Sequence, residues 1–267
     1  MIVKLESKNN QILKLIRSLD KRKFRDLESA YVVEGKIIVS EALSYAKNPL
    51  YLVVADSFLV KKENKALVDK ALERGVKTFQ VTDPIFAGLS KTEEPQGALL
   101  VLKKDECTWE VMMLNEQSIV VIIDGIQDPG NLGTIIRTSA AAGADAVILT
   151  KGTVDLYNDK TLRSTMGTFF KIKLKQGASH KEIIYNCGRL NLPLVIADSH
   201  GDVPYYSWDF TQGMALAIGN EAQGLSAELS SIAKAKLVIP MPGKTESLNA
   251  GVAAGIFLFE RVRQTHS

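Results

Sequence analysis

Three stretches in the C-terminal half of the chain combine small residues with amide, hydroxyl or ionic side chains. They are residues 124–137 with Asn131 and Arg137, residues 217–226 with Glu221, and residues 241–251 with Ser247 and Asn249. Amide and hydroxyl groups donate and accept hydrogen bonds, a carboxylate accepts them and a guanidinium donates them. Such groups could bind and orient a polar ligand, so they are the first candidates for a functional site.

The candidate side chains also have simpler structural explanations. Arg137 follows Ile135 and Ile136 in an expected helix, and in packed surroundings its guanidinium would need anionic partners. An Arg side chain can instead extend its charged end into solvent. Glu221 at the start of a helix could complement the helix dipole, and Ser247 could cap the last helix. Residue types alone leave these alternatives open.

Three familiar chemistries are disfavoured by spacing. The tripeptide Gly-Lys-Thr at 243–245 ends like a nucleotide-binding P-loop, but the first glycine of that motif is replaced by Val238. The turn at 130–133 has G-x-x-G spacing rather than the G-x-G-x-x-G of a dinucleotide site, and the following strand ends without an acid. No G-x-S-x-G nucleophile elbow is present. An ATPase, a dinucleotide-dependent dehydrogenase and a serine hydrolase are therefore disfavoured.

The elements that must position the three stretches form a repeating pattern. Continuous apolar runs, typical of strands buried on both faces of a parallel sheet, occur at 118–123, 145–149, 194–197, 214–218 and 236–240. Helices are expected between them at about 131–142, 160–167, 226–233 and 247–263. Strands that alternate with helices predict an α/β fold with a mostly parallel sheet. Ligands bind such sheets at the carboxyl ends of the strands, where the candidate loops lie.

The first half of the chain predicts a second α/β unit. Helices are expected at 8–19, 36–46, 62–73 and 84–90, and strands at 30–34, 50–54, 77–81 and 96–102. The expected domains are residues 1–103 and 118–267, joined by a polar linker at 104–117. The cations of the first 25 residues are Lys4, Lys8, Lys14, Arg17, Lys21, Arg22, Lys23 and Arg25, against two acids. A cationic helix can contact a phosphate backbone or simply be solvated, and charge alone leaves both open.

Composition sets further expectations. The 267 residues are 46% hydrophobic and 24% charged, with a net charge of +3, as in an ordinary globular protein. No apolar run is long enough to span a membrane, and the first residues do not resemble a secretory signal. The two cysteines form no CxxC pair, and the three histidines have no metal-ligand spacing. We expect a cytoplasmic protein without a metal or a membrane partner.

The three stretches resemble, in order and spacing, the three signature motifs of the SpoU (TrmH) family of RNA ribose 2′-O-methyltransferases. These motifs are N-x-G-x-x-x-R at 131–137, G-x-E-x-x-G-L at 219–225 and I-P-M-x-G-x-x-x-S-L-N at 239–249. Residues 158–167 are similar to the family segment N-x-K-x-x-R-x-S-x-G, with Thr165 in place of Ser. Other departures are Ala222 and the pair Ala250-Gly251. The first half also resembles family members at Ser7, Asn10, Lys14, Leu19, Lys23, Arg25, Glu34 and Gly35.

The resemblance implies a fold and a set of partners. The fold would be a SPOUT α/β domain with helices on both faces of a parallel sheet and a C-terminal trefoil knot, plus a small N-terminal α/β RNA-binding domain. S-adenosylmethionine would bind mainly to backbone groups at Gly219, Ile239, Leu248, Ile218, Met241 and Gly243. RNA would contact Lys14, Lys21, Arg22, Lys23, Arg25, Lys160 and Arg163. The protein would act as a homodimer.

The resemblance also implies catalytic roles. Arg137 would hold a phosphate and stabilise developing alkoxide charge on the ribose. Asn131 would fix Arg137 or the ribose, and Glu221 would pair with Arg137 or with a cation of the partner chain. Ser247 and Asn249 would hydrogen-bond the substrate or the motif loop. The substrate would be ribosomal RNA. The alternatives are a tRNA ribose methyltransferase and a non-catalytic RNA-binding or assembly protein that keeps the fold.

Overall fold

The computed structural model describes residues 1–243 and 245–266, which fold into two compact units. The N-terminal unit comprises Met1–Asp105 and Tyr157–Phe170, and the C-terminal unit comprises Glu106–Leu156 and the chain from Lys171 onward. The chain therefore passes from one unit to the other three times. Within the described residues, no helix is both long and apolar enough to span a bilayer.

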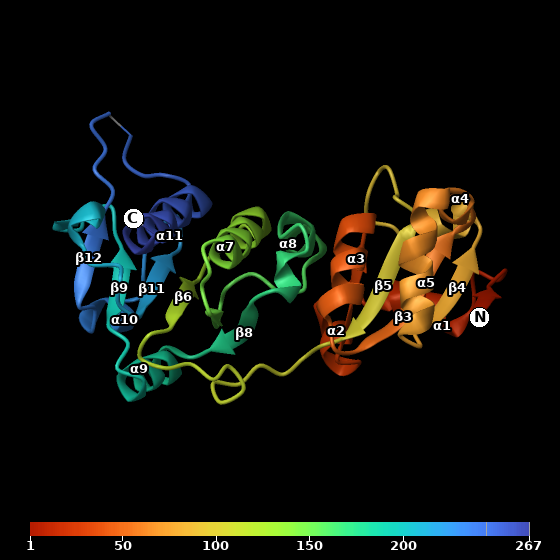
Figure 1. The fold of residues 1–267 in the computed structure, drawn as a ribbon, viewed down its shortest axis with the longest axis horizontal. Helices are drawn as coiled ribbons and strands as arrows, with labels where there is room; N and C mark the ends of the chain where they lie inside the picture. Colours follow the sequence, from red (N-terminus) through yellow and green to blue (C-terminus); the bar gives the residue numbers. More distant parts are fainter. Residues whose placement is uncertain (244, 267) are drawn as a thin grey trace. The chain divides into compact units, whose positions relative to one another are not determined.

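The N-terminal unit is built on a five-stranded mixed sheet (Figure 1). Its strands are β1 (Ile2–Lys4), β2 (Ala30–Glu34), β3 (Pro49–Ala55), β4 (Lys77–Val81) and β5 (Ala98–Lys103). They lie in the order β1-β4-β3-β5-β2, with β5 antiparallel to both of its neighbours. Its helices are α1 (Gln11–Ser18), α2 (Arg22–Leu27), α3 (Lys36–Tyr45), α4 (Asp56–Val60), α5 (Lys65–Glu73) and α6 (Asp83–Ala87). A 3-10 turn, η1 (Lys62–Asn64), precedes α5.

The N-terminal unit also contains a segment from the second half of the sequence. Residues 157–170 form α8 (Asp159–Ser164) and the 3-10 turn η2 (Thr168–Phe170). The ring of Tyr157 lies 4.6 Å from that of Tyr31 on β2, and Phe169 lies 5.9 Å from Tyr31. A Cβ atom on Gly167 would come within 2.6 Å of Glu41 Cγ on α3. The segment is thus packed tightly onto β2 and α3, far from it in sequence.

The C-terminal unit has a seven-stranded sheet in which every strand pair is parallel. Its strands are β6 (Ile119–Asp124), β7 (Ala146–Thr150), β8 (Lys173–Ala178), β9 (Leu194–Ala197), β10 (Val203–Pro204), β11 (Met214–Gly219) and β12 (Ala235–Val238). Their order is β10-β12-β9-β11-β6-β7-β8. The parallel α/β architecture predicted from the apolar runs is confirmed.

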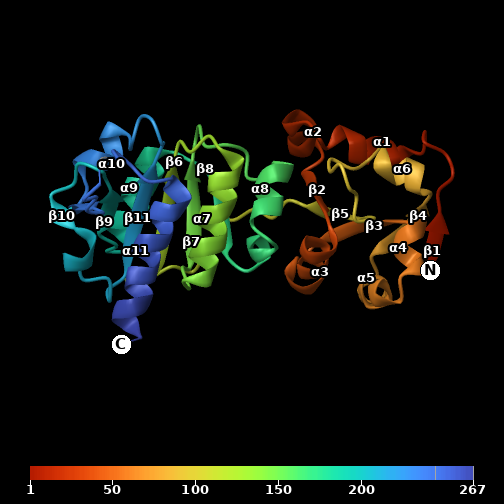
Figure 2. The same ribbon diagram turned by 90° about the horizontal axis from the view of Figure 1, so that it is seen from above.

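Helices cover both faces of this sheet. They are α7 (Pro129–Ala141), α9 (His180–Arg189), α10 (Ala227–Ser231) and α11 (Ala250–Thr265), with a 3-10 turn, η3 (Tyr205–Ser207). α7 and α11 run side by side on one face (Figure 2). On the other face, Val120 and Ile122 of β6 pack in one core with Ile183 and Cys187 of α9. Successive strand residues point to opposite faces, which explains why β6 is apolar at every position but its last.

Some expected elements differ from the structure. The strand β8 and the helix α9 were not predicted, because Lys173 and Lys175 interrupt the apolar run and α9 begins with polar residues. The last helix begins at Ala250 rather than at 247, because the Asn249 side chain caps it. Its Oδ1 accepts hydrogen bonds from the backbone N–H groups of Gly251 (2.9 Å) and Val252 (3.3 Å).

Candidate functional site

A cavity of about 400 Å³ lies at the carboxyl ends of β9, β11 and β12. Of the residues predicted to contact a cofactor, those that line it are Ile218, Gly219, Ile239, Met241 and Leu248. The predicted catalytic residues Glu221 and Ser247 line it as well. Gly243 is exposed and is not among the lining residues. The loops after β11 and β12, the two strands that flank β9, therefore meet at one cavity.

The cavity also has walls that the motifs did not indicate. Residues 197–200, at the end of β9 and directly after it, line it together with Ser230, Ala253 and Phe257. No family motif covers the loop after β9, which follows a strand of the parallel sheet. Phe257 is buried on α11, and its aromatic ring gives the cavity an apolar side.

Two glycines shape the loop after β11. Asn220 and Gly224 exchange backbone hydrogen bonds of 3.0 and 2.9 Å, which folds the loop back onto itself. A Cβ atom on Gly219 would lie 2.4 Å from the carbonyl carbon of Gly224, so only glycine fits there. Gly224 has φ +68°, a left-handed conformation that glycine adopts without strain. The two glycines thus let the two ends of the loop come close together at the wall of the cavity.

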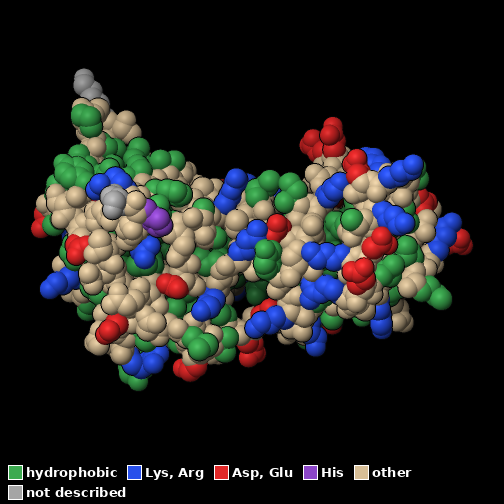
Figure 3. All heavy atoms as spheres, viewed as in Figure 1, with side chains coloured by type: hydrophobic (Ala, Val, Ile, Leu, Met, Phe, Trp, Pro, Cys, Tyr) green, Lys and Arg blue, Asp and Glu red, His purple; other side chains and the backbone are tan. Residues whose placement is uncertain are grey.

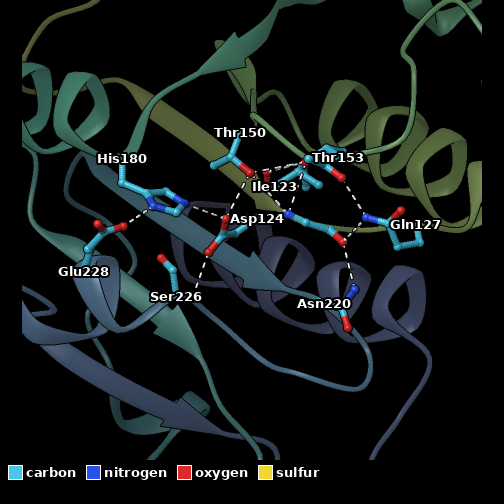
Figure 4. A network of polar contacts seen from close by, with 11 residues as sticks. Ile123, Asp124, Gln127, Thr150, Thr153, His180, Asn220, Ser226 and Glu228 are labelled. Atoms are coloured by element: carbon cyan, nitrogen blue, oxygen red, sulfur yellow. Dashed lines mark hydrogen bonds and ion pairs between the residues drawn. The ribbon is translucent and has the colours of Figure 1, made fainter.

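The Asn220 side chain ties this loop to the end of β6. Its Oδ1 accepts from the N–H groups of Ala222 (2.9 Å) and Gln223 (3.0 Å), and its Nδ2 donates to the Gly125 carbonyl (2.8 Å). The second and first motif stretches are therefore joined by a short network, which Figure 4 shows.

One amide joins all three motif stretches. Asn131 Nδ2 donates to Glu221 Oε1 at 2.6 Å, and Asn131 Oδ1 accepts from Asn249 Nδ2 at 2.8 Å. Asn131 sits in the first turn of α7, where its own N–H is held by the capping Asp128 carboxylate (2.8 Å). Three of the five predicted catalytic residues therefore form a continuous hydrogen-bonded group.

Arg137 lies apart from this group. It is exposed on α7 rather than in packed surroundings. Among residues 1–243 and 245–266, no ion pair or hydrogen bond to its side chain is found, and Glu221 is engaged by Asn131 instead. The predicted pairing of Glu221 with Arg137 is thus not made within one chain.

A buried carboxylate at the end of β6 holds the residue that follows the β11 loop (Figure 4). Asp124, 6% exposed at the end of β6, accepts hydrogen bonds from Thr150 Oγ1 (2.9 Å), His180 Nε2 (2.9 Å) and the Ser226 N–H (2.8 Å). Burial by itself would raise the pKa of Asp124, but these hydrogen bonds outweigh it and the pKa lies below its usual value. Asp124 is therefore a fixed negative charge at neutral pH.

The predicted RNA contacts lie in the N-terminal unit, and most are accessible. Lys14, Lys21, Arg22, Lys23 and Lys160 are exposed, and basic side chains are spread over the face of this unit shown in Figure 3. Arg163 is half-buried and pairs with Asp159 on α8, Nη1 to Oδ2 at 2.6 Å.

Arg25 does not suit the predicted RNA contact. Its side chain is buried, 7% exposed, and Nη1 donates to the carbonyls of Leu19 (2.8 Å) and Asp20 (2.6 Å). The guanidinium holds the end of α1 and is not presented to a phosphate backbone. The sequence shows that Arg25 is one of several cations, but it does not show that Arg25 is buried while its neighbours are exposed.

The fold and site define a class of α/β protein whose ligand cavity is assembled from loops at the carboxyl edge of an all-parallel sheet. Residues 118–259 match the model of the SpoU rRNA Methylase family, and residues 9–100 match the MRM3-like substrate binding domain. The chain belongs to the SpoU rRNA methylase family.

Individual relatives agree with this assignment. The chain is 34% identical to the 23S rRNA (guanosine(2553)-2′-O)-methyltransferase RlmP of Bacillus subtilis, across 96% of this chain and 97% of the relative. It is 32% identical to a 23S rRNA (uridine(2479)-2′-O)-methyltransferase of Streptomyces viridochromogenes, across 73% of this chain and 71% of that protein. The crystal structure of an AdoMet-bound rRNA methyltransferase from Sinorhizobium meliloti superposes with a TM-score of 0.87 at 31% identity, covering 100% and 99% of the two chains.

Proposed function

We propose that this protein transfers the methyl group of S-adenosylmethionine to a ribose 2′-hydroxyl of ribosomal RNA. The observation that carries the proposal is that residues of the second and third family motifs line one cavity, and that Asn131 of the first motif is hydrogen-bonded to both Glu221 and Asn249. The relatives named for 2′-O-methylation of 23S rRNA support the reaction and the class of RNA. Those two relatives are named for different nucleotides, so the target position is not inferred from them.

The cavity suits S-adenosylmethionine. Its volume of about 400 Å³ lies within the usual range for small-molecule sites, roughly 300–1,000 Å³. Ile218, Ile239 and Leu248 offer apolar walls for an adenine ring, and Gly219 allows the backbone to approach the ligand closely. Ile218, Gly219, Ile239, Met241 and Leu248 would hold the cofactor, and Gly243 would shape the loop from outside the cavity. When bound, its sulfonium supplies an activated methyl group.

The residues beside the cavity would prepare the ribose oxygen. Methyl transfer requires the 2′-oxygen to be held in line and to lose its proton. Asn131 and Asn249 would orient the ribose or the loop around it, with Glu221 fixing the Asn131 amide and Ser247 donating a hydrogen bond. A guanidinium stays protonated because its pKa lies above about 12. Arg137 would therefore bind the adjacent phosphate and stabilise alkoxide charge rather than accept the proton.

Arg137 would complete the site of a second copy in a homodimer. α11, which packs beside α7, exposes the apolar side chains of Val252 (53%) and Phe259 (49%), seven residues and two helical turns apart. Covering these side chains with a second copy would remove apolar surface from water. Arg137 is exposed on α7, the helix that packs beside α11, and in the dimer it would meet an anionic group at the site of the other protomer.

The N-terminal unit would bind the sugar-phosphate backbone of the RNA. Lys14, Lys21, Arg22 and Lys23 are exposed on and around α1 and α2, and Lys160 is exposed on α8. Contacts of this kind give affinity that falls steeply with salt and carry little sequence information. Only RNA supplies the 2′-hydroxyl, so DNA would bind without reacting.

Tritiated methyl transfer from S-adenosylmethionine tests the function directly. Wild type and Arg137→Ala are compared on unmodified ribosomal RNA and on tRNA. We expect label in ribosomal RNA that survives alkali as a dinucleotide, and at least about a hundredfold loss in Arg137→Ala, as for removal of a group that stabilises developing charge. Wild-type activity in the variant would contradict the role of Arg137, and label confined to tRNA would contradict the substrate.

A further inference from the structure

His180 lies between two carboxylates that come from different elements (Figure 4). Its Nε2 faces Asp124 Oδ1 on β6 at 2.9 Å, and its Nδ1 faces Glu228 Oε2 on α10. The residue opens α9 and is part of none of the family motifs. Ionised carboxylates only accept hydrogen bonds, so both contacts are made together only when both ring nitrogens carry a proton.

These contacts form a closed network with the start of α10, directly after the loop that lines the cavity. Asp124 Oδ2 accepts from the N–H of Ser226, the residue that precedes α10, and Glu228 lies in the first turn of that helix. The start of α10 is thus connected to Asp124 twice, once directly through Ser226 and once through His180 and Glu228. Residues 219–225 run between this anchor and β11, and they line the cavity.

We propose that His180 is a positioning residue that, when doubly protonated, clamps the start of α10 and so holds the 219–225 wall in the shape that binds S-adenosylmethionine. The proposal rests on the proposed function for the identity of the ligand. It assigns His180 no contact with cofactor or RNA, since the ring acts through Asp124 and Glu228.

The clamp gives cofactor binding a defined pH dependence. Burial would lower the pKa of His180, but the hydrogen bonds from its ring to Asp124 and Glu228 outweigh burial and raise the pKa above its usual value. A group with a raised pKa contributes fully below its ordinary value and loses its contribution as pH rises through the raised one. Among the described residues, the charged groups that act on the ring are Asp124 from β6 and Glu228 from α10, while Thr150 on β7 adds a neutral hydroxyl to Asp124.

Titration calorimetry with S-adenosylmethionine from about pH 6 to about pH 9 tests the clamp, because this range spans the titration of a histidine. In wild type, we expect affinity to fall by about three- to tenfold towards the alkaline end, as one titrating group can produce. His180→Gln would bind weakly at every pH, because a neutral amide cannot donate to both carboxylates as a cation does. His180→Arg would keep a charge that does not titrate and would flatten the profile near the acid-side affinity of wild type.

Kinetics separate positioning from a general loss of structure. His180→Gln should raise KM for S-adenosylmethionine and leave kcat at saturating cofactor within about twofold of wild type, since uniform binding is lost but chemistry is not. Glu228→Gln, at a 62% exposed side chain, removes one partner without disturbing the core and should give a smaller shift in the same direction. His266→Gln is the matched control, because among the described residues the ring of His266 hydrogen-bonds only to Val262 and Thr265 of α11.

The outcomes are distinct. A flat affinity profile in wild type, or a His180→Gln profile that superposes on wild type, would overturn the clamp while leaving methyl transfer intact. Wild type that binds no S-adenosylmethionine at any pH would contradict both the clamp and the proposed function. If His180→Gln does not fold, by its unfolding midpoint, the comparison of Glu228→Gln with His266→Gln decides the question.

Discussion

The side-chain amide of Asn131 has one orientation that satisfies its surroundings. Its NH2 group faces the Glu221 carboxylate and its oxygen faces the NH2 group of Asn249. A flipped amide would set oxygen against carboxylate and donor against donor, so both contacts would be lost together. One residue of α7 therefore fixes the relative placement of the loops after β11 and before α11.

Gly219 is a backbone position that cannot accept a side chain unless its neighbours move. In Gly219→Ala the new Cβ would meet the Gly224 backbone, so the loop that walls the cavity must move. Overpacking of this kind costs about 1–3 kcal/mol, or roughly 5- to 140-fold in affinity. We expect S-adenosylmethionine binding, measured by calorimetry, to weaken by that factor while the protein stays folded.

Gly188→Ala is the matched control for this substitution. Gly188 lies in α9, and a Cβ there would meet nothing within 4 Å. Replacing a helical glycine by alanine stabilises a protein by about 0.5–1 kcal/mol. Equal cofactor binding in Gly219→Ala and Gly188→Ala would show that the loop tolerates a side chain and would refute the close-approach argument.

At the scale of elements, the sequence predicted best those strands whose side chains are buried on both faces of the sheet. β6 and β11 are buried along almost their whole length and were predicted from their apolar runs. The edge strand β8 is half-exposed and carries alternating lysines, so its sequence does not differ enough from a loop. The His180 contacts could not be predicted, because Asp124 and Glu228 lie 56 and 48 residues away in sequence. The site residues came from the family motifs, whereas spacing alone left their roles open.

The cations in and around α1 and α2 are either buried and structural or exposed. Substituting a buried cation should affect stability, and substituting an exposed one should affect RNA binding. Arg25 ties the end of α1 to α2 through two carbonyls, whereas Lys23 is exposed. We expect Arg25→Ala to lower the free energy of unfolding by about 2 kcal/mol, as for loss of hydrogen bonds from a charged group. Urea denaturation followed by circular dichroism measures this.

Lys23→Ala is the counterpart of that variant. It should leave the unfolding curve unchanged and weaken ribosomal RNA binding. The slope of the logarithm of the binding constant against the logarithm of the salt concentration should fall by about one, as for the loss of one phosphate contact. Filter binding at several salt concentrations measures both quantities. A destabilised Lys23→Ala, or an Arg25→Ala of wild-type stability, would reverse the assignment of the two residues.

At the scale of the whole molecule, the exposed apolar side chains on α11 predict the assembly. Phe259→Glu places a charge on the face proposed to meet a second copy, and burying an unpaired charge there is costly. We expect the dimer to dissociate at least about ten times more readily in sedimentation equilibrium, because a central aromatic contact is lost. Methyl transfer should fall with it, since Arg137 would no longer reach a partner.

The control is an exposed aromatic residue on the opposite face of the sheet. Tyr185 on α9 is 69% exposed, and Tyr185→Glu should leave the association state unchanged. If the Phe259→Glu variant sediments like wild type, the contact between subunits does not involve this face of α11. A monomer of full activity would instead show that each chain carries a complete site.

The three passages of the chain between its units bear on how such a protein can be recombined. A chimera joined near Asp105 would replace β2 and α3 but keep residues 157–170 of the original protein. Tyr157 and Phe169 would then face a foreign surface in place of Tyr31, and Gly167 would face an unmatched neighbour in place of Glu41. The N-terminal half therefore cannot be exchanged between proteins by itself. It must be transferred together with the short segment at 157–170.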